Sequence, residues 1–261
     1  MALPVSVRRE RFPGFCAFSI GLLTTDAAAY RWLVLCVFAL WLSACSDGIT
    51  AGVQGVVLST SGAPQIRARD EQQAHQLTAD THPTAGDTIQ TDANSWAAVA
   101  LNPSVLAAVE PASKVQIVDL SLSKDGNETE DSMRGRAAHV KLISGSLILS
   151  QERSDVSVEP RLTLETPDGV VVSSFDCLFT VQADAAATRV TCASGYVYLE
   201  HPGAEADQVK PGSVRELPRA GRARTVAAEL DPVGQATITR ALESETEMRA
   251  LRAKLVDVLP R

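Results

Sequence analysis

The sequence predicts an all-β domain followed by a C-terminal α-helix, and three features carry this prediction. Between residues 53 and 217 the chain is a series of short apolar runs separated by glycine, proline and aspartate. Several runs alternate strictly between apolar and polar residues, which is the period of a β-strand. Turn residues recur at intervals of about 8 to 12 positions, as in β-sandwiches, barrels and β-helices. We therefore expect a β-sandwich or a β-helical domain of short antiparallel strands.

The expected strands follow one another closely along this region. They lie at 53–59, 64–68, 96–101, 105–110, 114–120, 138–150, 161–167, 169–174, 177–182, 188–193, 195–200 and 213–217. Alternation is clear in "LFTVQ", where Phe179 and Val181 share one face. Two polar stretches, at 70–85 and 121–136, contain few apolar residues, so we expect them to be mostly loop.

The end of the chain changes character and predicts an amphipathic helix over 232–259. Pro232 suits the first turn of a helix, and Pro260 cannot continue one. The apolar residues form a narrow stripe with a seven-residue repeat, made of Ala241, Met248, Leu251, Leu255 and Val258. This stripe could pack on the protein's own domain or contact a partner helix. We favour the first interpretation, because about two and a half heptads are too few to indicate a coiled coil.

The N-terminal region resembles a bacterial lipoprotein signal. From Trp32 to Ala44 the chain is apolar apart from one serine, and a bilayer-spanning helix needs more residues, about 20. A run of this length preceded by Arg31 matches the apolar region of a secretory signal. It ends in "LSAC", which resembles the lipobox, in which the cysteine is lipidated and the chain is cut before it. We therefore expect residues 1–44 to be a signal peptide and Cys45 to carry the lipid.

The lipoprotein resemblance also implies a location. Residues 45–52 then form a tether between the lipid and the β domain. Ser46, rather than aspartate, follows the lipidated cysteine, and by the sorting rule of such proteins this implies the outer membrane, facing the periplasm, more than the inner membrane. Elsewhere in the sequence no segment is long and apolar enough to span a bilayer.

The charge of the chain argues against nucleic acid as a partner. The full sequence has a formal net charge of −7, and removal of residues 1–44, with four arginines and two acidic residues, makes it −9. An acidic surface repels phosphate backbones.

Residues 86–217 resemble the FecR domain, which is named after a periplasmic iron-dicitrate regulator. The segments that carry the resemblance are "GDTIQTDANSWAAVAL", "RAAHVKLISGSLIL", "LETPDGVVVSSFDCLFTVQ", "TRVTCASGYVYLE" and "VKPGSVREL". The matching motif positions are Gly86, Asp87, Ile89, Thr91, Thr166, Pro167, Gly169, Phe179, Val181, Gly195, Val197 and Leu199. The sequence departs from the family at Asn102-Pro103-Ser104, where an Asp-Gly-Ser turn is common. The resemblance implies an all-β module of the cell envelope.

The sequence contains no recognisable catalytic or metal-binding motif. None of the four histidines stands at zinc-ligand spacing from a cysteine, and nucleophile-elbow, P-loop and dinucleotide motifs are absent. We therefore expect no enzyme activity, no metal and no cofactor. The expected function is a lipid-anchored module that presents a FecR-like domain to an envelope protein partner. The alternative is a periplasmic sensing component of a FecR-type signalling system, which would relay a state through the C-terminal helix.

Two cysteines, Cys177 and Cys192, remain for pairing after the leader is removed and Cys45 is lipidated. Export would place them in an oxidising compartment, where paired thiols form disulfides. If the chain reverses at Asp184-Ala185, the register pairs Val181 with Thr188, Phe179 with Val190 and Cys177 with Cys192. We therefore expect a disulfide; the alternative is two buried thiols.

Overall fold

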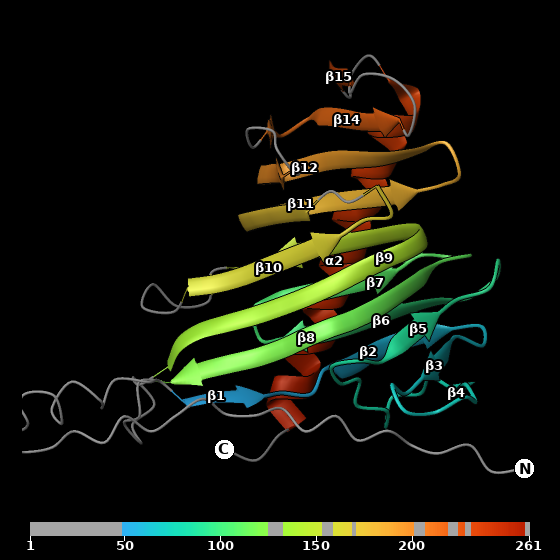
Figure 1. Ribbon diagram of the computed structural model, residues 1–261, viewed down its shortest axis with the longest axis vertical. Coiled ribbons are helices and arrows are strands. Elements are labelled where there is room, and N and C mark those ends of the chain that lie inside the picture. Colours follow the sequence, from blue (N-terminus) through green and yellow to red (C-terminus); the bar gives the residue numbers. More distant parts are fainter. Residues whose placement is uncertain are drawn as a thin grey trace, which may run out of the picture. The chain divides into compact units, whose positions relative to one another are not determined.

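The computed structural model describes residues 49–124, 133–152, 159–168, 171–200, 207–218, 224–227 and 231–258. It confirms the predicted class: strands dominate the described chain, and a C-terminal helix, α2 (Pro232–Val258), follows them (Figure 1). Fifteen strands form one hydrogen-bonded sheet. They are β1 (Ile49–Gly52), β2 (Val56–Ser61), β3 (Gln65–Arg67), β4 (His75–Gln76), β5 (Thr88–Gln90), β6 (Trp96–Asn102), β7 (Val105–Val109), β8 (Lys114–Lys124), β9 (Met133–Gln151), β10 (Glu159–Glu165), β11 (Val171–Ala183), β12 (Ala187–Glu200), β13 (Asp207–Val209), β14 (Ser213–Pro218) and β15 (Arg224–Ala227).

Three long strands connect two halves of this sheet. In β9, residues 133–144 pair with β8, whereas residues 145–151 pair with β7 and β11. β11 and β12 change neighbours along their length in the same way. We call the part around β3, β5, β8 and β10 the open half, and the part around β2, β6, β7 and β14 the covered half. The pairs are antiparallel except for β9 with β10, which is parallel.

The inward-facing positions change parity where the long strands cross between the halves. In β9 the core positions are Ala138, Val140 and Leu142 and then Leu147 and Leu149; in β12 they are Val190 and Cys192 and then Val197 and Leu199. Gly145 and Gly195 lie between these sets, with φ angles of 90° and 73°. Such backbone angles favour glycine. They let each strand bend while its side chains on both sides of the bend still face the core.

The glycine at the bend of β12 faces a bulge in β11. The register between the two strands shifts between Phe175 and Leu178, and Asp176 has a φ of 44°. A Cβ atom at Gly195 would overlap the carbonyl oxygen of Asp176 and would lie 2.8 Å from the Cα of Cys177. This close approach of two backbones requires a glycine.

The main core receives side chains from both halves of the sheet. Its members from the open half include Ile66, Ile89 and Ile117, and those from the covered half include Val99 and Phe179. Because one contiguous cluster contains both sets, the sheet folds over on itself around the core, with strands passing through the corners.

Helix α2 packs on the outer face of the covered half, behind the strands in Figure 1. Ala241 and Met248 are about 1% exposed and belong to a second apolar cluster with Ala98, Leu106, Ala108, Ile148 and Leu178. Asp231 caps the helix, because its Oδ1 accepts a hydrogen bond from the backbone N–H of Val233 at 3.2 Å. The interpretation of the stripe as a face that packs on the protein's own domain is therefore confirmed at Ala241 and Met248, whereas the side chains of Leu255 and Val258 lie outside the described part of the structure. Within the described residues, no helix has both the length and the apolar character that crossing a membrane requires.

The described strands differ from the expected ones in number and in length. The short strands β1, β4, β5, β13 and β15 are not among the expected ones, and β4 lies within the expected loop at 70–85. β9 has 19 residues, and β11 and β12 have 13 and 14, so these three are not short. Part of the expected loop at 121–136 is strand, because β8 continues to Lys124 and β9 begins at Met133; residues 125–132 lie outside the described residues. Polar residues in these segments pair across strands, as Ser121 does with Ala137. Strand pairing thus extends beyond the apolar runs that predicted it.

The register predicted for the hairpin of β11 and β12 is wrong by two residues. Val181 lies opposite Val190, and Phe179 lies opposite Cys192. The reason is the position of Asp184, whose Oδ1 accepts hydrogen bonds from the N–H groups of Ala186 and Ala187 at 2.7 and 2.9 Å. Aspartate therefore stands before the two-residue loop, at the first position of the turn, and not inside the loop.

Candidate functional site, a groove between the helix and the sheet

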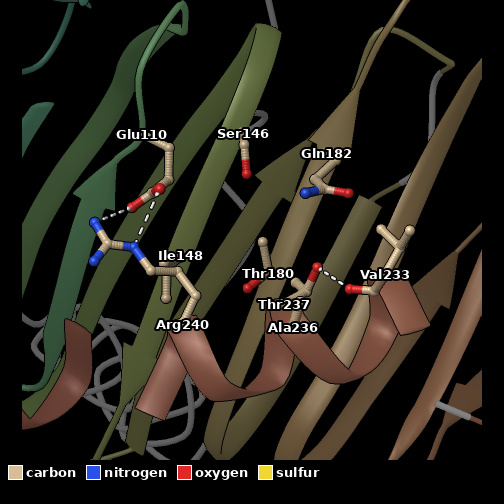
Figure 2. A pocket seen from close by; sticks show the side chains of 9 residues that line it. All are labelled: Glu110, Ser146, Ile148, Thr180, Gln182, Val233, Ala236, Thr237 and Arg240. Carbon is tan, nitrogen blue, oxygen red and sulfur yellow. Dashed lines mark hydrogen bonds and ion pairs between the residues drawn. The ribbon is translucent and has the colours of Figure 1, made fainter. Parts of the chain in front are cut away.

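A groove of about 230 Å³ separates the first turns of α2 from the sheet (Figure 2). We call it the helix groove. The sheet contributes Glu110, Ser146, Ile148, Thr180 and Gln182, and the helix contributes Val233, Ala236, Thr237 and Arg240. β7, β9 and β11 position the sheet residues, since Glu110 directly follows β7.

The groove exists because the facing side chains of the helix are small. Along α2 the buried positions are Gly234, Thr237, Ala241, Ser244 and Met248. Their spacing of three and four residues keeps them on one face. Only the last of them is long, so the helix fills the space against the sheet at that end and leaves it unfilled near Ala236 and Thr237.

One buried hydroxyl group in the groove lacks a hydrogen bond. Thr180 is 2% exposed, and its Oγ1 has no hydrogen-bond partner among the described residues. Across the groove, the hydroxyl of Thr237 donates to the carbonyl oxygen of Val233 at 2.8 Å, within its own helix. An unsatisfied buried polar group costs about 1 to 3 kcal/mol. Thr180 is therefore the groove residue with most to gain from a polar atom of a ligand.

An ion pair joins the two walls of the groove. Arg240 of α2 lies 3.4 Å from the carboxylate of Glu110, with side chains 47% and 16% exposed (Figure 2). An ion pair with this exposure contributes about 0 to 1 kcal/mol. The pair therefore adds charge to the groove but contributes little to holding the helix in place.

More polar contacts, at shorter distances, link the far end of α2 to the sheet. The hydroxyl of Ser150 donates to Glu245 at 2.5 Å, and Glu152 accepts from Arg249 and Arg252, each at 2.8 Å. Arg252 also donates to the carbonyl oxygen of Pro103 at 2.8 Å. The helix is thus held tightly beyond Ala241 and less tightly along the groove.

The first motif of the family resemblance builds a turn rather than the groove. Asp87 accepts hydrogen bonds from the backbone N–H and the hydroxyl of Thr84, at 2.8 and 3.1 Å. The hydroxyl of Thr91 donates to the carbonyl oxygen of Glu110 at 2.6 Å and accepts from the N–H of Ser113 at 2.9 Å. Asp87 thus closes a turn before β5, and Thr91, directly after β5, joins that strand to the segment between β7 and β8.

The other motif positions also have structural roles where the structure describes them. Thr166 is buried after β10, Pro167 beside it is exposed, and Gly169 lies outside the described residues. The remaining motif residues lie in the core or at a bend, and they are Phe179, Val181, Gly195, Val197 and Leu199. In β11, Phe179 and Val181 alternate with the groove residues Thr180 and Gln182. The motif residues thus position β11, which carries groove residues, but they do not line the groove themselves.

The two cysteines lie in the main core and are not joined. Cys192 faces Phe179, and Cys177 faces Gln151 of β9, so the register that suggested a disulfide is absent. Both are buried thiols in the structure. The S–H of Cys192 is within 3.5 and 3.4 Å of the carbonyl oxygens of Ser194 and Gly195. Burial raises the pKa of Cys192 from 9.0 to about 11, which keeps the thiol protonated.

The predicted lipidation site cannot be placed in this fold. Cys45 and the signal segment 1–44 lie outside the described residues. The second part of the expected tether is a strand, because Ile49–Gly52 forms β1 and pairs with β8.

The groove offers groups that can donate and accept hydrogen bonds. It is lined by hydroxyl, amide and carboxylate groups and one guanidinium, and its lining contains no histidine, cysteine or lysine. Among the described residues, no three side chains of histidine, cysteine, aspartate or glutamate are grouped so that they could hold a metal ion.

Comparison with known proteins gives matches among solved structures. No family model matches the chain, and no curated protein matches it. The chain is similar to two crystal structures of a candidate anti-sigma factor from Parabacteroides distasonis, with TM-scores of 0.39 and 0.40 and 13% sequence identity. Each match covers 56% of this chain and 65% or 64% of the other chain. A similarity at this level does not establish a shared function.

Proposed function

We propose that this chain is a non-catalytic, lipid-anchored protein of the cell envelope, whose FecR-like β domain binds a protein partner through the helix groove. The observation that carries the proposal is the groove itself, with the unsatisfied hydroxyl of Thr180 inside it. The lipobox-like "LSAC" supports an anchor at Cys45, in the outer membrane facing the periplasm. No metal or cofactor forms part of the proposal.

The dimensions of the groove favour a protein as the occupant. Pockets for drug-sized molecules measure about 300 to 1,000 Å³, and the groove has about 230 Å³. This volume suits a few side chains of a docking segment. Gln182 and Ser146 can exchange hydrogen bonds with such a segment, and the Arg240–Glu110 pair can interact with a charge at its edge.

Filling the groove tests this proposal. Ala236→Leu adds bulk at the exposed rim of the groove, whereas Ala250→Leu makes the same change at an exposed position of α2 outside the groove. We expect cross-linking from intact membranes, followed by affinity capture, to recover a partner with the wild type and with Ala250→Leu but not with Ala236→Leu. Circular dichroism should show the same fold for all three. Equal recovery by both variants would contradict the proposed binding site.

The anchor needs a separate test, because the groove can bind without it. Cys45→Ala should abolish labelling by a radioactive fatty acid and release the protein from the membrane fraction. A Cys45→Ala protein that still takes up the label would show that the lipid is attached elsewhere or that the signal was misread.

A sensing role is the second candidate, and one observation favours it. α2 forms one wall of the groove, so an occupant contacts the sheet and the helix together. In a relay, partner binding changes amide hydrogen exchange along the whole helix, including Ser244 to Arg252. In a passive scaffold, the change stays within the groove. Hydrogen exchange with and without the captured partner distinguishes the two functions.

A further inference from the structure

A second surface, independent of the helix groove, lies on the open half. β5 pairs with both β3 and β8, so the three strands lie side by side at one end of the sheet (Figure 1). Ile66, Ile89 and Val115 of these strands point into the core. The alternate residues form two rows on the outer face, Gln65–Gln90–Lys114 and Arg67–Thr88–Gln116.

This outer face contains two adjoining hollows of about 130 and 380 Å³. Both are lined by Arg67, Gln72 and Thr88, so Arg67 stands where they meet. The smaller hollow also contains Lys114, and the larger one contains Arg69. We call the two together the cationic hollow. It combines three positive charges with amide and hydroxyl groups.

The three cations of the hollow have no acidic partner. No hydrogen bond or ion pair of Arg67, Arg69 or Lys114 side chains is found among the described residues. The acidic residue that lines the hollow, Glu71, is bonded to His75 at 2.8 Å. Among the other described residues, several cations are ion-paired: Lys141, Arg189, Arg215, Arg240, Arg249 and Arg252. In a chain with net charge −7, three unpaired cations in one place are unusual.

The backbone holds one of these cations in position. Gly86 has a φ of +100°, and a Cβ atom there would lie 2.7 Å from the Cβ and the Cδ of Arg69. The stem of Arg69 therefore lies directly against the glycine, in space that a side chain at position 86 would occupy. A preorganised guanidinium loses less conformational entropy when it binds an anion.

We propose that the cationic hollow binds a small molecule that carries two neighbouring phosphate groups. Arginine guanidinium groups match the geometry of phosphate oxygens and bond them in pairs, and lysine adds a further charge. The two hollows meet at Arg67, so this residue can contact both phosphates, with Arg69 on one side and Lys114 on the other. The glutamine amides and the Thr88 hydroxyl supply neutral hydrogen bonds.

Titration of the full chain with inorganic pyrophosphate tests the proposal. We expect saturable binding that weakens as salt concentration rises, and binding of orthophosphate at least tenfold weaker. Arg67→Gln should weaken pyrophosphate binding about 10- to 100-fold, because each hydrogen bond to a charged group contributes about 1.5 to 3 kcal/mol. Arg69→Gln should weaken it similarly.

A matched control separates a built site from general attraction. Arg161 is exposed on β10 and has no partner among the described residues, so Arg161→Gln removes the same charge from another place. We expect less than a twofold effect. Equal losses in Arg67→Gln and Arg161→Gln, no pyrophosphate binding at millimolar concentration, or binding only to vesicles of anionic phospholipid would each overturn the proposal. Thermal melts of each variant verify folding.

Discussion

The two halves of the sheet both have an apolar inner face, but their outer faces differ in polarity. Under α2, the covered half has small and apolar residues such as Ala98, Ala108 and Ile148. On the open half, the equivalent surface of β3, β5 and β8 is polar and charged, as at Arg67 and Gln116. β9 passes through both, and on it Ile143 is 39% exposed whereas Ile148 is 1% exposed. Two isoleucines of one strand thus differ only in whether a helix covers them.

This difference separates the two candidate binding surfaces. The helix groove lies at the edge of the covered half, where the helix has small side chains and leaves space. The cationic hollow lies where no described helix covers the sheet and the strands carry polar residues. An occupant of the groove must interact with the helix, whereas a ligand of the hollow need not.

The largest effect is expected at the boundary of the halves, where β12 bends. Gly195 and Gly212 have nearly equal φ angles, 73° and 72°. A Cβ atom at Gly195 would overlap the β11 backbone, but at Gly212 it would meet nothing within 4 Å. We expect Gly195→Ala to lower the free energy of unfolding by more than about 4 kcal/mol, and Gly212→Ala by about 1 to 2 kcal/mol. Urea denaturation measures both, and similar costs would show that the close approach at Gly195 does not exist.

The comparison between the outer faces has its own matched pair on β9. Ile148→Ala removes a side chain beneath α2 and should cost about 2 to 5 kcal/mol. Ile143→Ala makes the same change on the open face and should stay within about 0.5 kcal/mol. If chemical denaturation gives equal values for the two variants, α2 does not cover this part of the sheet.

The smallest effect concerns the buried thiol of Cys192, in the core that both halves share. Its pKa is raised from 9.0 to about 11 in the folded state, so its protonated form is favoured by folding. Stability is therefore complete below about pH 9 and falls as the pH rises towards 11, by up to about 3 kcal/mol. Cys192→Ala should be less stable near pH 8 and lose less stability between pH 9 and 11. Parallel pH curves for both proteins would be inconsistent with a shifted thiol.

The same residue decides between a disulfide and two thiols. Protein recovered from an oxidising compartment and unfolded without reduction should accept two alkylating groups, at Cys177 and Cys192. If mass spectrometry finds no alkylated cysteine, the two cysteines form a disulfide, and the strands must be arranged differently at the bend.

Alternation in the sequence was sufficient to predict most of the strands and the face of Phe179 and Val181. It did not predict the short strands β1, β4, β5, β13 and β15, which have two to four residues each. The C-terminal helix was predictable from its apolar stripe and from Pro232. The hairpin register was not predictable, because it depends on two hydrogen bonds that the Asp184 side chain accepts, which place the turn one position further along the chain. A one-position shift of the turn moves every opposed pair by two residues.

The candidate sites were harder to predict than the fold, for two physical reasons. The wall of the helix groove consists of residues such as Ala236 and Thr237, which are notable only for being small. A search of the sequence for large apolar residues or catalytic residues does not detect them. The cationic hollow joins Arg67 and Lys114, which are far apart in the sequence and meet only through the pairing of β3, β5 and β8. Because these residues are far apart in the sequence, they form no local motif that sequence analysis could detect.

The long strands that pass through both halves make the domain one cooperative unit. Hydrogen bonds of β9, β11 and β12 serve the open half at one end and the covered half at the other. Neither half can therefore separate from the sheet while the other keeps all its pairs. Amide protons in the two halves should exchange through the same global opening and at the same free energy, and fraying should be confined to short edge strands such as β4 and β15.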